Sequence, residues 1–151
     1  MSEAAQSTFV YVTYIRTSAA KLWSALFQPE FTRRYWYGMD MVCDWKAGAP
    51  WQLRFADGRV GDTGEVLEIE PPRRLVLRWQ NEFRPELKAE GPAKCTFELE
   101  PNGEIMKLTI THSSPRKDSQ LIVAVSGGWP KILSNLKSLL ETGQPMTGER
   151  L

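Results

Sequence analysis

The chain has 151 residues, 42% of them apolar and 25% charged, which is ordinary for one globular domain that buries its own core. Its 19 basic and 18 acidic residues leave a net charge of +1, so it lacks the basic footprint of a nucleic-acid-binding protein. No stretch approaches the ~18 continuous apolar residues of a membrane helix, and the first residues resemble no signal peptide. We therefore expect a cytoplasmic protein that does not insert into membranes. Residues 1–151 should form a single domain with its core at about 9–143 and flexible termini.

The first forty residues predict one strand followed by two short helices. Residues 8–16 are rich in β-branched and aromatic side chains, which favours a strand. Ser18 is a suitable N-cap for a helix over residues 18–27. Pro29 suits the first turn of a second helix, and Gly38 is a typical residue to end it.

Between residues 41 and 112 the pattern changes to short strands and tight turns. Asp57-Gly58 is a strong hairpin signal, and Pro71-Pro72 ends the strand that follows it. The glycines at 58, 61 and 64 indicate strand turns rather than a phosphate-binding loop. The predicted strands cover residues 41–45, 51–55, a segment ending at 69, 75–79, 95–99 and 106–112. Strands joined by such turns predict an antiparallel sheet with one apolar face.

The chain returns to helical periodicity after Pro115. A broad apolar stripe at helical spacing is formed by Ile132, Leu133, Leu136, Leu139 and Leu140. Gly143 is a suitable C-terminal stop, while Pro130 marks either a kink or the true start of the helix. One amphipathic helix covering the apolar face of a sheet predicts a two-layer α+β fold.

Several local motifs, in their order and spacing, resemble a known family. They are LWSAL at 22–26 ahead of Pro29, GEVLEI at 64–69, PPRRL at 71–75, LTITH at 108–112 and GWP at 128–130. Over residues 9–143 the chain is similar to stand-alone members of the group named after the activator of the heat-shock-protein-90 ATPase. This group lies in the START-like superfamily, also called SRPBCC or helix-grip.

The resemblance implies a fold and three alternative functions. The implied helix-grip fold is a curved antiparallel sheet of about seven strands wrapped around a long C-terminal helix, with two short helices after the first strand. A cavity between sheet and helix would bind a small hydrophobic or aromatic molecule. One alternative is a cofactor-free cyclase or hydrolase that uses the polar groups Glu65 and His112 inside the cavity. The other is an interaction module that contacts a chaperone. In each case the protein would be a monomer or a homodimer.

Strand alternation suggests which side chains face that cavity. If Trp79 faces inward, so do its partners two residues away along the strand, and the same rule applies to the neighbouring strands. Counting in this way also places Glu65 and His112 on the apolar side. Each is either a buried group bonded to backbone or water, or a polar anchor for a ligand. No second group at a defined spacing supports acid–base catalysis, so we assign no catalytic residue.

The candidate ligand site is therefore mainly aromatic. Aromatic rings on opposite walls suit a ring-containing ligand, although they also fill space as ordinary core. We expect the cavity to be entered near Trp36, capped by Trp129 and larger than about 300 Å³. The candidate residues are Trp36, Trp51, Phe55, Glu65, Trp79, Phe97, Ile110, His112, Trp129 and Leu133. One histidine and two distant cysteines match no metal-site spacing, so we expect neither a metal nor a cofactor.

Overall fold

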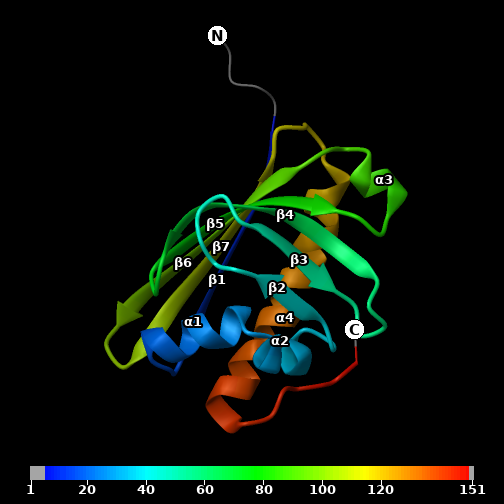
Figure 1. Cartoon of the computed structure of the whole chain (residues 1–151). Coiled ribbons are helices and arrows are strands. Elements are labelled where there is room, and N and C mark those ends of the chain that lie inside the picture. The colour runs from blue at the N-terminus through cyan, green and yellow to red at the C-terminus, as the bar shows by residue number, and fades with distance from the viewer. Residues whose placement is uncertain (1–5, 150–151) are drawn as a thin grey trace.

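A computed structural model describes residues 6–149, which form seven strands and four helices (Figure 1). The strands are β1 (Ser7–Ile15), β2 (Asp40–Cys43), β3 (Pro50–Arg54), β4 (Val60–Glu70), β5 (Arg74–Asn81), β6 (Ala93–Asn102) and β7 (Ile105–Ser114). The helices are α1 (Ala19–Phe27), α2 (Pro29–Tyr35), α3 (Pro85–Lys88) and α4 (Gln120–Thr142). Residues 1–5 and 150–151, which belong to the termini expected to be flexible, lie outside the described residues.

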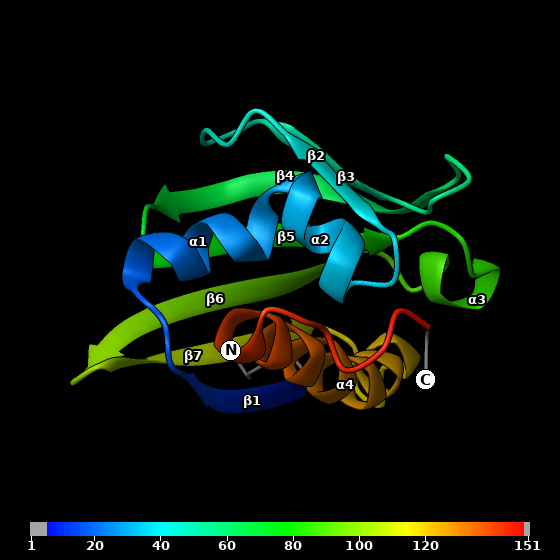
Figure 2. The same cartoon turned by 90° about the horizontal axis from the view of Figure 1, so that it is seen from below.

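The strands form one antiparallel sheet in the order β1-β7-β6-β5-β4-β3-β2. The first strand therefore pairs with the last, and Figure 2 shows α1, α2 and α4 on the same face of this sheet. The helix-grip α+β fold predicted from the sequence is confirmed. The short helix α3 is not among the predicted elements, because the polar segment 80–91 has no helical apolar periodicity.

Helix α4 begins well before its apolar stripe. Ser119 is its N-cap, with Oγ accepting a hydrogen bond from Ile122 N at 3.2 Å. Glu90 also accepts from Gln120 N at 2.7 Å, so a carboxylate lies at the positive end of the helix dipole. Pro130 lies inside this continuous helix and does not start it. The helix ends at Gly143, whose φ of 87° is the left-handed conformation that glycine adopts easily.

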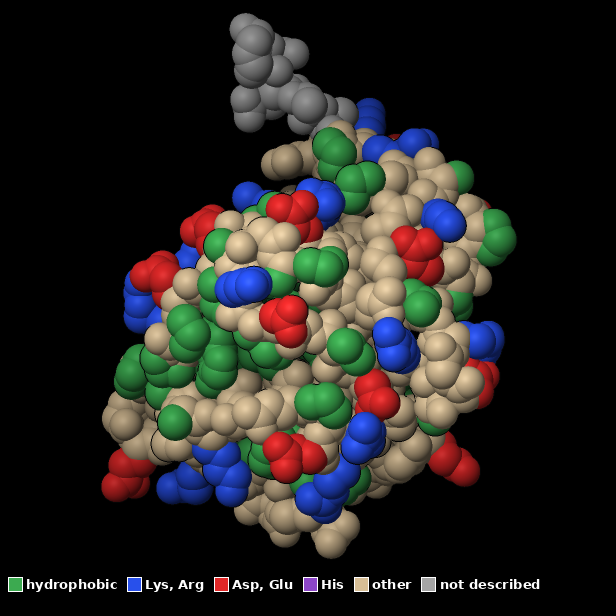
Figure 3. Space-filling view, viewed as in Figure 1, with side chains coloured by type: hydrophobic (Ala, Val, Ile, Leu, Met, Phe, Trp, Pro, Cys, Tyr) green, Lys and Arg blue, Asp and Glu red, His purple; other side chains and the backbone are tan. Residues whose placement is uncertain are grey.

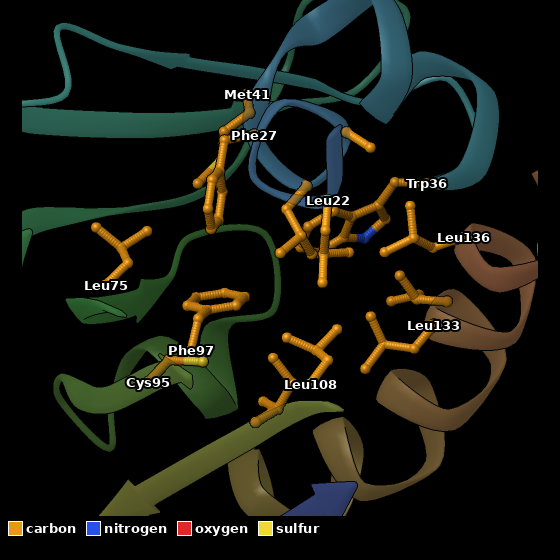
Figure 4. Close-up of a cluster of buried hydrophobic side chains, with 14 of the residues drawn as sticks. Leu22, Phe27, Trp36, Met41, Leu75, Cys95, Phe97, Leu108, Leu133 and Leu136 are labelled. Carbon is orange, nitrogen blue, oxygen red and sulfur yellow. The ribbon is translucent and has the colours of Figure 1, made fainter. Parts of the chain in front are cut away.

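The core lies between the sheet and α4. Leu75, Leu77 and Trp79 of β5 all face it, as strand alternation predicted, and each is at most 4% exposed. Figure 4 shows Leu133 and Leu136 of α4 pointing into the same cluster as Trp36. Burying one such leucine fully contributes about 1.5–3 kcal/mol to stability. The amphipathic stripe thus attaches α4 to the sheet.

The outer surface carries mixed charge. On the face shown in Figure 3, Lys and Arg side chains are interspersed with Asp and Glu, as the net charge of +1 suggests. Within residues 6–149, no helix is long and apolar enough to cross a membrane.

Candidate functional site

A pocket opens beside the N-terminal half of α4, next to α3 and the ends of β3, β4 and β5. We call it the α4 pocket, and its volume is about 140 Å³. It is lined by Trp36, Met39, Leu53, Phe55, Asp62, Trp79, Asn81, Phe83, Arg84, Leu87, Leu121, Ala124, Val125, Gly128, Trp129 and Ile132. This volume is below the ~300 Å³ expected from the sequence, so the size prediction is wrong. Buried aromatic side chains, among them Trp36, Trp79 and Trp129, fill much of the concave side of the sheet.

Three tryptophans from three different elements form one wall of the α4 pocket. Trp36 follows α2, Trp79 lies in β5 and Trp129 lies in α4. The ring centroid of Trp129 lies 5.3 Å from that of Trp36 and 5.9 Å from that of Trp79. Trp36 and Trp79 are stacked with centroids 6.3 Å apart. Such contacts add about 0.5–1.5 kcal/mol per pair beyond area burial, so they stabilise this wall.

The entrance differs from the one predicted. Trp36 is only 5% exposed and belongs to the inner wall. The prediction that the pocket is entered near Trp36 is therefore wrong. Phe83 is 44% exposed and contacts Phe55 edge-to-face, with centroids 5.0 Å apart. These two phenylalanines therefore lie toward the solvent side of the lining.

A polar pair missed by the sequence analysis lies in the same lining. Asp62 Oδ1 accepts hydrogen bonds from Trp79 Nε1 at 3.0 Å and from Asn81 Nδ2 at 3.4 Å. Asp62 is 7% exposed and Asn81 5%, and they are register partners on β4 and β5. The sequence does contain a signal for Asn81: it follows Trp79 by two residues, so strand alternation alone places its side chain inward.

Glu65 faces the opposite side of the sheet, so its predicted inward placement is wrong. It pairs in register with Arg78, and their side chains form an ion pair at 2.9 Å on the outer face. Counting every second residue along the strand placed Glu65 on the same face as Leu67 and Ile69. A bulge between Val66 and Glu68 breaks that alternation, so Val66 is buried and Leu67 is 41% exposed.

His112 faces inward, as predicted, but lies behind the tryptophans rather than in the lining. It is 0% exposed, and its Nδ1 accepts a hydrogen bond from Trp129 Nε1 at 3.1 Å. The proton of the neutral ring is therefore on Nε2, which has no hydrogen-bond partner among the described residues. Burial lowers the pKa of His112 to about 3, so the ring is neutral at physiological pH. Glu65 and His112 share no cavity, and an enzyme that uses both is not supported.

The remaining candidates are core residues. Trp51, Phe97, Ile110 and Leu133 are each at most 1% exposed and lie outside the lining of the α4 pocket. Trp51 packs on Trp79 with centroids 4.6 Å apart, and Phe97 contacts Trp129 edge-to-face. They support the aromatic wall from behind. Of the ten candidates, the lining contains Trp36, Phe55, Trp79 and Trp129.

We expect the chain's only histidine to make stability fall on mild acidification. The pKa of His112 is about 3 when folded and about 6.5 in the unfolded chain, so below pH 6.5 protons bind the unfolded state preferentially. The free energy of unfolding should fall by about 1 kcal/mol between pH 7.5 and 5.5. Urea unfolding at both pH values measures this loss.

The variant His112→Asn is the matched control for this titration. Asparagine does not titrate but can still accept a hydrogen bond from Trp129, so its stability should change little over the same pH interval. Equal slopes for the parent and the variant would show that His112 is not the responsible group.

The order of elements and the sheet topology can be compared with known proteins. A family model described as "Activator of Hsp90 ATPase homolog 1-like protein" matches residues 16–141. The chain belongs to this family. All residues that line the α4 pocket fall within the matched segment. No curated protein sequence matches significantly.

Solved structures share the fold of this Hsp90-activator-like domain. The protein MLL2253 from Mesorhizobium loti has 26% sequence identity and a TM-score of 0.75, with 89% of this chain and 97% of that chain covered. The Aha1 dimer from Colwellia psychrerythraea has 20% identity and a TM-score of 0.74, with coverages of 91% and 98%. DynU16, a putative protein of the dynemicin biosynthetic locus, has 22% identity and a TM-score of 0.73, with coverages of 91% and 48%.

Proposed function

We propose that this Hsp90-activator-like domain binds a small hydrophobic or aromatic molecule in the α4 pocket, with residues 1–151 acting as one cytoplasmic domain. The observation that carries the proposal is the wall of Trp36, Trp79 and Trp129 beside the buried Asp62–Asn81 pair. Ligand sites typically combine apolar walls with a few positioned polar groups. The similarity in fold to a biosynthetic-locus protein agrees with a small-molecule ligand.

The size of the pocket restricts the ligand. An apolar cavity of about 150 Å³ is large enough for benzene. The α4 pocket, at about 140 Å³, therefore suits a single ring whose substituent extends past Phe83 toward solvent. A long acyl chain or a fused polycyclic molecule would need the aromatic wall to move.

Binding of a single-ring compound should be saturable and should stabilise the fold. We expect benzyl alcohol or indole to change tryptophan emission, because three of the six tryptophans line the pocket. At a concentration of 100 times Kd, a ligand adds about 2.7 kcal/mol, which raises Tm by about 5–10 °C for a chain of this size. Fluorescence titration and thermal unfolding measure both effects.

A filled pocket provides the control. Ala124 lines the α4 pocket, whereas its neighbour Val123 is 61% exposed and lies outside the lining. Ala124→Phe should abolish the response to ligand while the protein stays folded, and Val123→Phe should leave the response unchanged. Equal binding by both variants would place the ligand elsewhere.

A second candidate function is a protein-interaction module for a chaperone. The observation that favours it is the family itself, which is named after an activator of the Hsp90 ATPase. The volume of the α4 pocket, about 140 Å³, is smaller than that of a typical ligand site, which also favours this candidate. Stimulation of the ATPase of purified Hsp90 would support it. The relative from Colwellia is described as a dimer, so light scattering should accompany that assay to distinguish a monomer from a homodimer.

A further inference from the structure

Trp129 of α4 forms the inner limit of the α4 pocket. Its side chain lies in the pocket lining. The same indole also contacts Phe97 and His112, with ring centroids 5.8 and 6.3 Å away, and both of these residues lie outside that lining. The orientation of the Trp129 indole therefore determines how far the pocket extends toward the core.

The backbone around Trp129 is the part of α4 that favours a helix least. Residues 126–130 are Ser-Gly-Gly-Trp-Pro within a continuous helix. Glycine and proline have the lowest helix propensities, and Pro130 has no N–H to donate to the carbonyl of Ser126. Close packing does not account for Gly127, because a Cβ added there would have nothing within 4 Å. This stretch of backbone therefore constrains the indole of Trp129 only weakly.

A buried hydrogen bond supplies the missing constraint. Trp129 Nε1 donates to His112 Nδ1 at 3.1 Å, and both residues are buried. His112 is itself held in the middle of the sheet, because it pairs in register with Phe9 on β1 and Cys95 on β6, and Trp79 meets its ring edge-to-face. Ring contacts tolerate several orientations, whereas a hydrogen bond is directional, and a buried N–H without an acceptor is costly. The bond to His112 therefore fixes the indole in one orientation.

We infer that His112 is a positioning residue that sets the size of ligand that the α4 pocket accepts, because it holds the indole of Trp129 across the inner end of the pocket. This inference rests on the proposed function. His112 does not touch the ligand and acts only through Trp129. A ligand that extends past the indole has to break the hydrogen bond, whereas a smaller ligand leaves it intact. Removing the acceptor therefore favours the larger ligand selectively.

Two alcohols that differ in ring size test the inference. They are benzyl alcohol and 2-naphthalenemethanol, and fluorescence titration gives the ratio of their dissociation constants for each protein. His112→Leu removes the acceptor and should raise the relative affinity for 2-naphthalenemethanol at least about fivefold, because no hydrogen bond has to break. The matched control His112→Asn keeps an acceptor for Trp129, so its ratio should stay within about twofold of the parent's.

A second measurement reports on the indole without any ligand. The NMR signal of the Trp129 indole N–H is the one that Trp129→Phe lacks, and its exchange with solvent measures how firmly it is held. Trp51 Nε1, which donates to Arg78 O at 3.0 Å, is the internal reference for overall stability. In His112→Leu the Trp129 signal should exchange at least about tenfold faster relative to that of Trp51. In His112→Asn the two rates should keep the parent's ratio.

The outcomes separate the inference from the proposed function. Thermal unfolding shows whether each variant is folded, and His112→Phe, which also lacks an acceptor, decides if His112→Leu is unfolded. If the variant without an acceptor keeps the parent's ratio of dissociation constants, or its Trp129 N–H exchanges no faster relative to Trp51, the inference is wrong and the proposed function stands. If neither alcohol binds the unmodified protein, the proposed function fails and the inference fails with it.

Discussion

Leu136→Asp is expected to unfold the protein. Leu136 lies in the middle of α4 and is 0% exposed, with Leu133 and Trp36 in the same buried cluster (Figure 4). Truncating a buried leucine already costs about 2–5 kcal/mol, and an unpaired carboxylate in an apolar site costs several more. Because domains are stable by only about 5–15 kcal/mol, this one change removes most or all of the stability.

Circular dichroism and urea unfolding of the Leu136→Asp variant measure this effect. Val123→Asp is the matched control, because Val123 is on the same helix and is 61% exposed. We expect that control to unfold within about 0.5 kcal/mol of the parent. Cooperative unfolding of Leu136→Asp at the parent's urea midpoint would contradict the packing of α4 on the sheet.

Gly64→Ala is the second substitution with a large expected effect. Gly64 lies within β4, between its register partners Trp51 on β3 and Trp79 on β5. A Cβ built on Gly64 would lie 1.7 Å from Arg78 O and 2.6 Å from Trp51 Nε1. These two atoms hydrogen-bond to each other at 3.0 Å, so the added methyl group would collide with backbone and break this bond. Because Gly64 has no side chain, the indole of Trp51 on β3 can reach across β4 to the backbone of β5.

We expect Gly64→Ala to lower the free energy of unfolding by about 3 kcal/mol or more, because strand separation and loss of tryptophan packing combine. Gly127→Ala is the control, because Gly127 lies in α4 with nothing within 4 Å of the added Cβ. That change should be neutral or stabilising by up to about 1 kcal/mol. Denaturant unfolding curves compare the two, and a Gly64→Ala midpoint equal to the parent's would contradict the close approach.

The position of Gly64 also corrects a prediction made from the spacing of the glycines. The glycines at 58, 61 and 64 were all interpreted as turn residues. Gly58 does adopt a turn conformation with φ of 92°, but Gly61 and Gly64 lie inside β4. Spacing alone does not distinguish a glycine needed for backbone freedom from one needed for space. Only the position of Trp51 on the neighbouring strand shows which it is.

Local patterns in the sequence predicted every element except α3, and most of the inward faces. The family motifs predicted the sheet and the long helix. Alternation placed Leu75, Leu77, Trp79 and His112 inward, and all four are buried. This works because the two-residue repeat of a strand and the 3.6-residue repeat of a helix are local properties of the chain. A contiguous apolar pattern is sufficient to identify the face that must be covered.

Which inward residues line the α4 pocket depends on how whole elements pack against one another. Trp51 and Trp79 face the same way on nearby strands, yet Trp79 lies in the lining and Trp51 behind it. The bulge in β4 turned Glu65 outward, and the register of β4 with β5 brought Asp62 beside Asn81. Each of these results depends on how a strand is shifted against its neighbour and where α4 crosses the sheet. One extra residue in a strand moves the side chains beyond it to the other face of the sheet. The apolar pattern of a single strand does not show where such a bulge occurs.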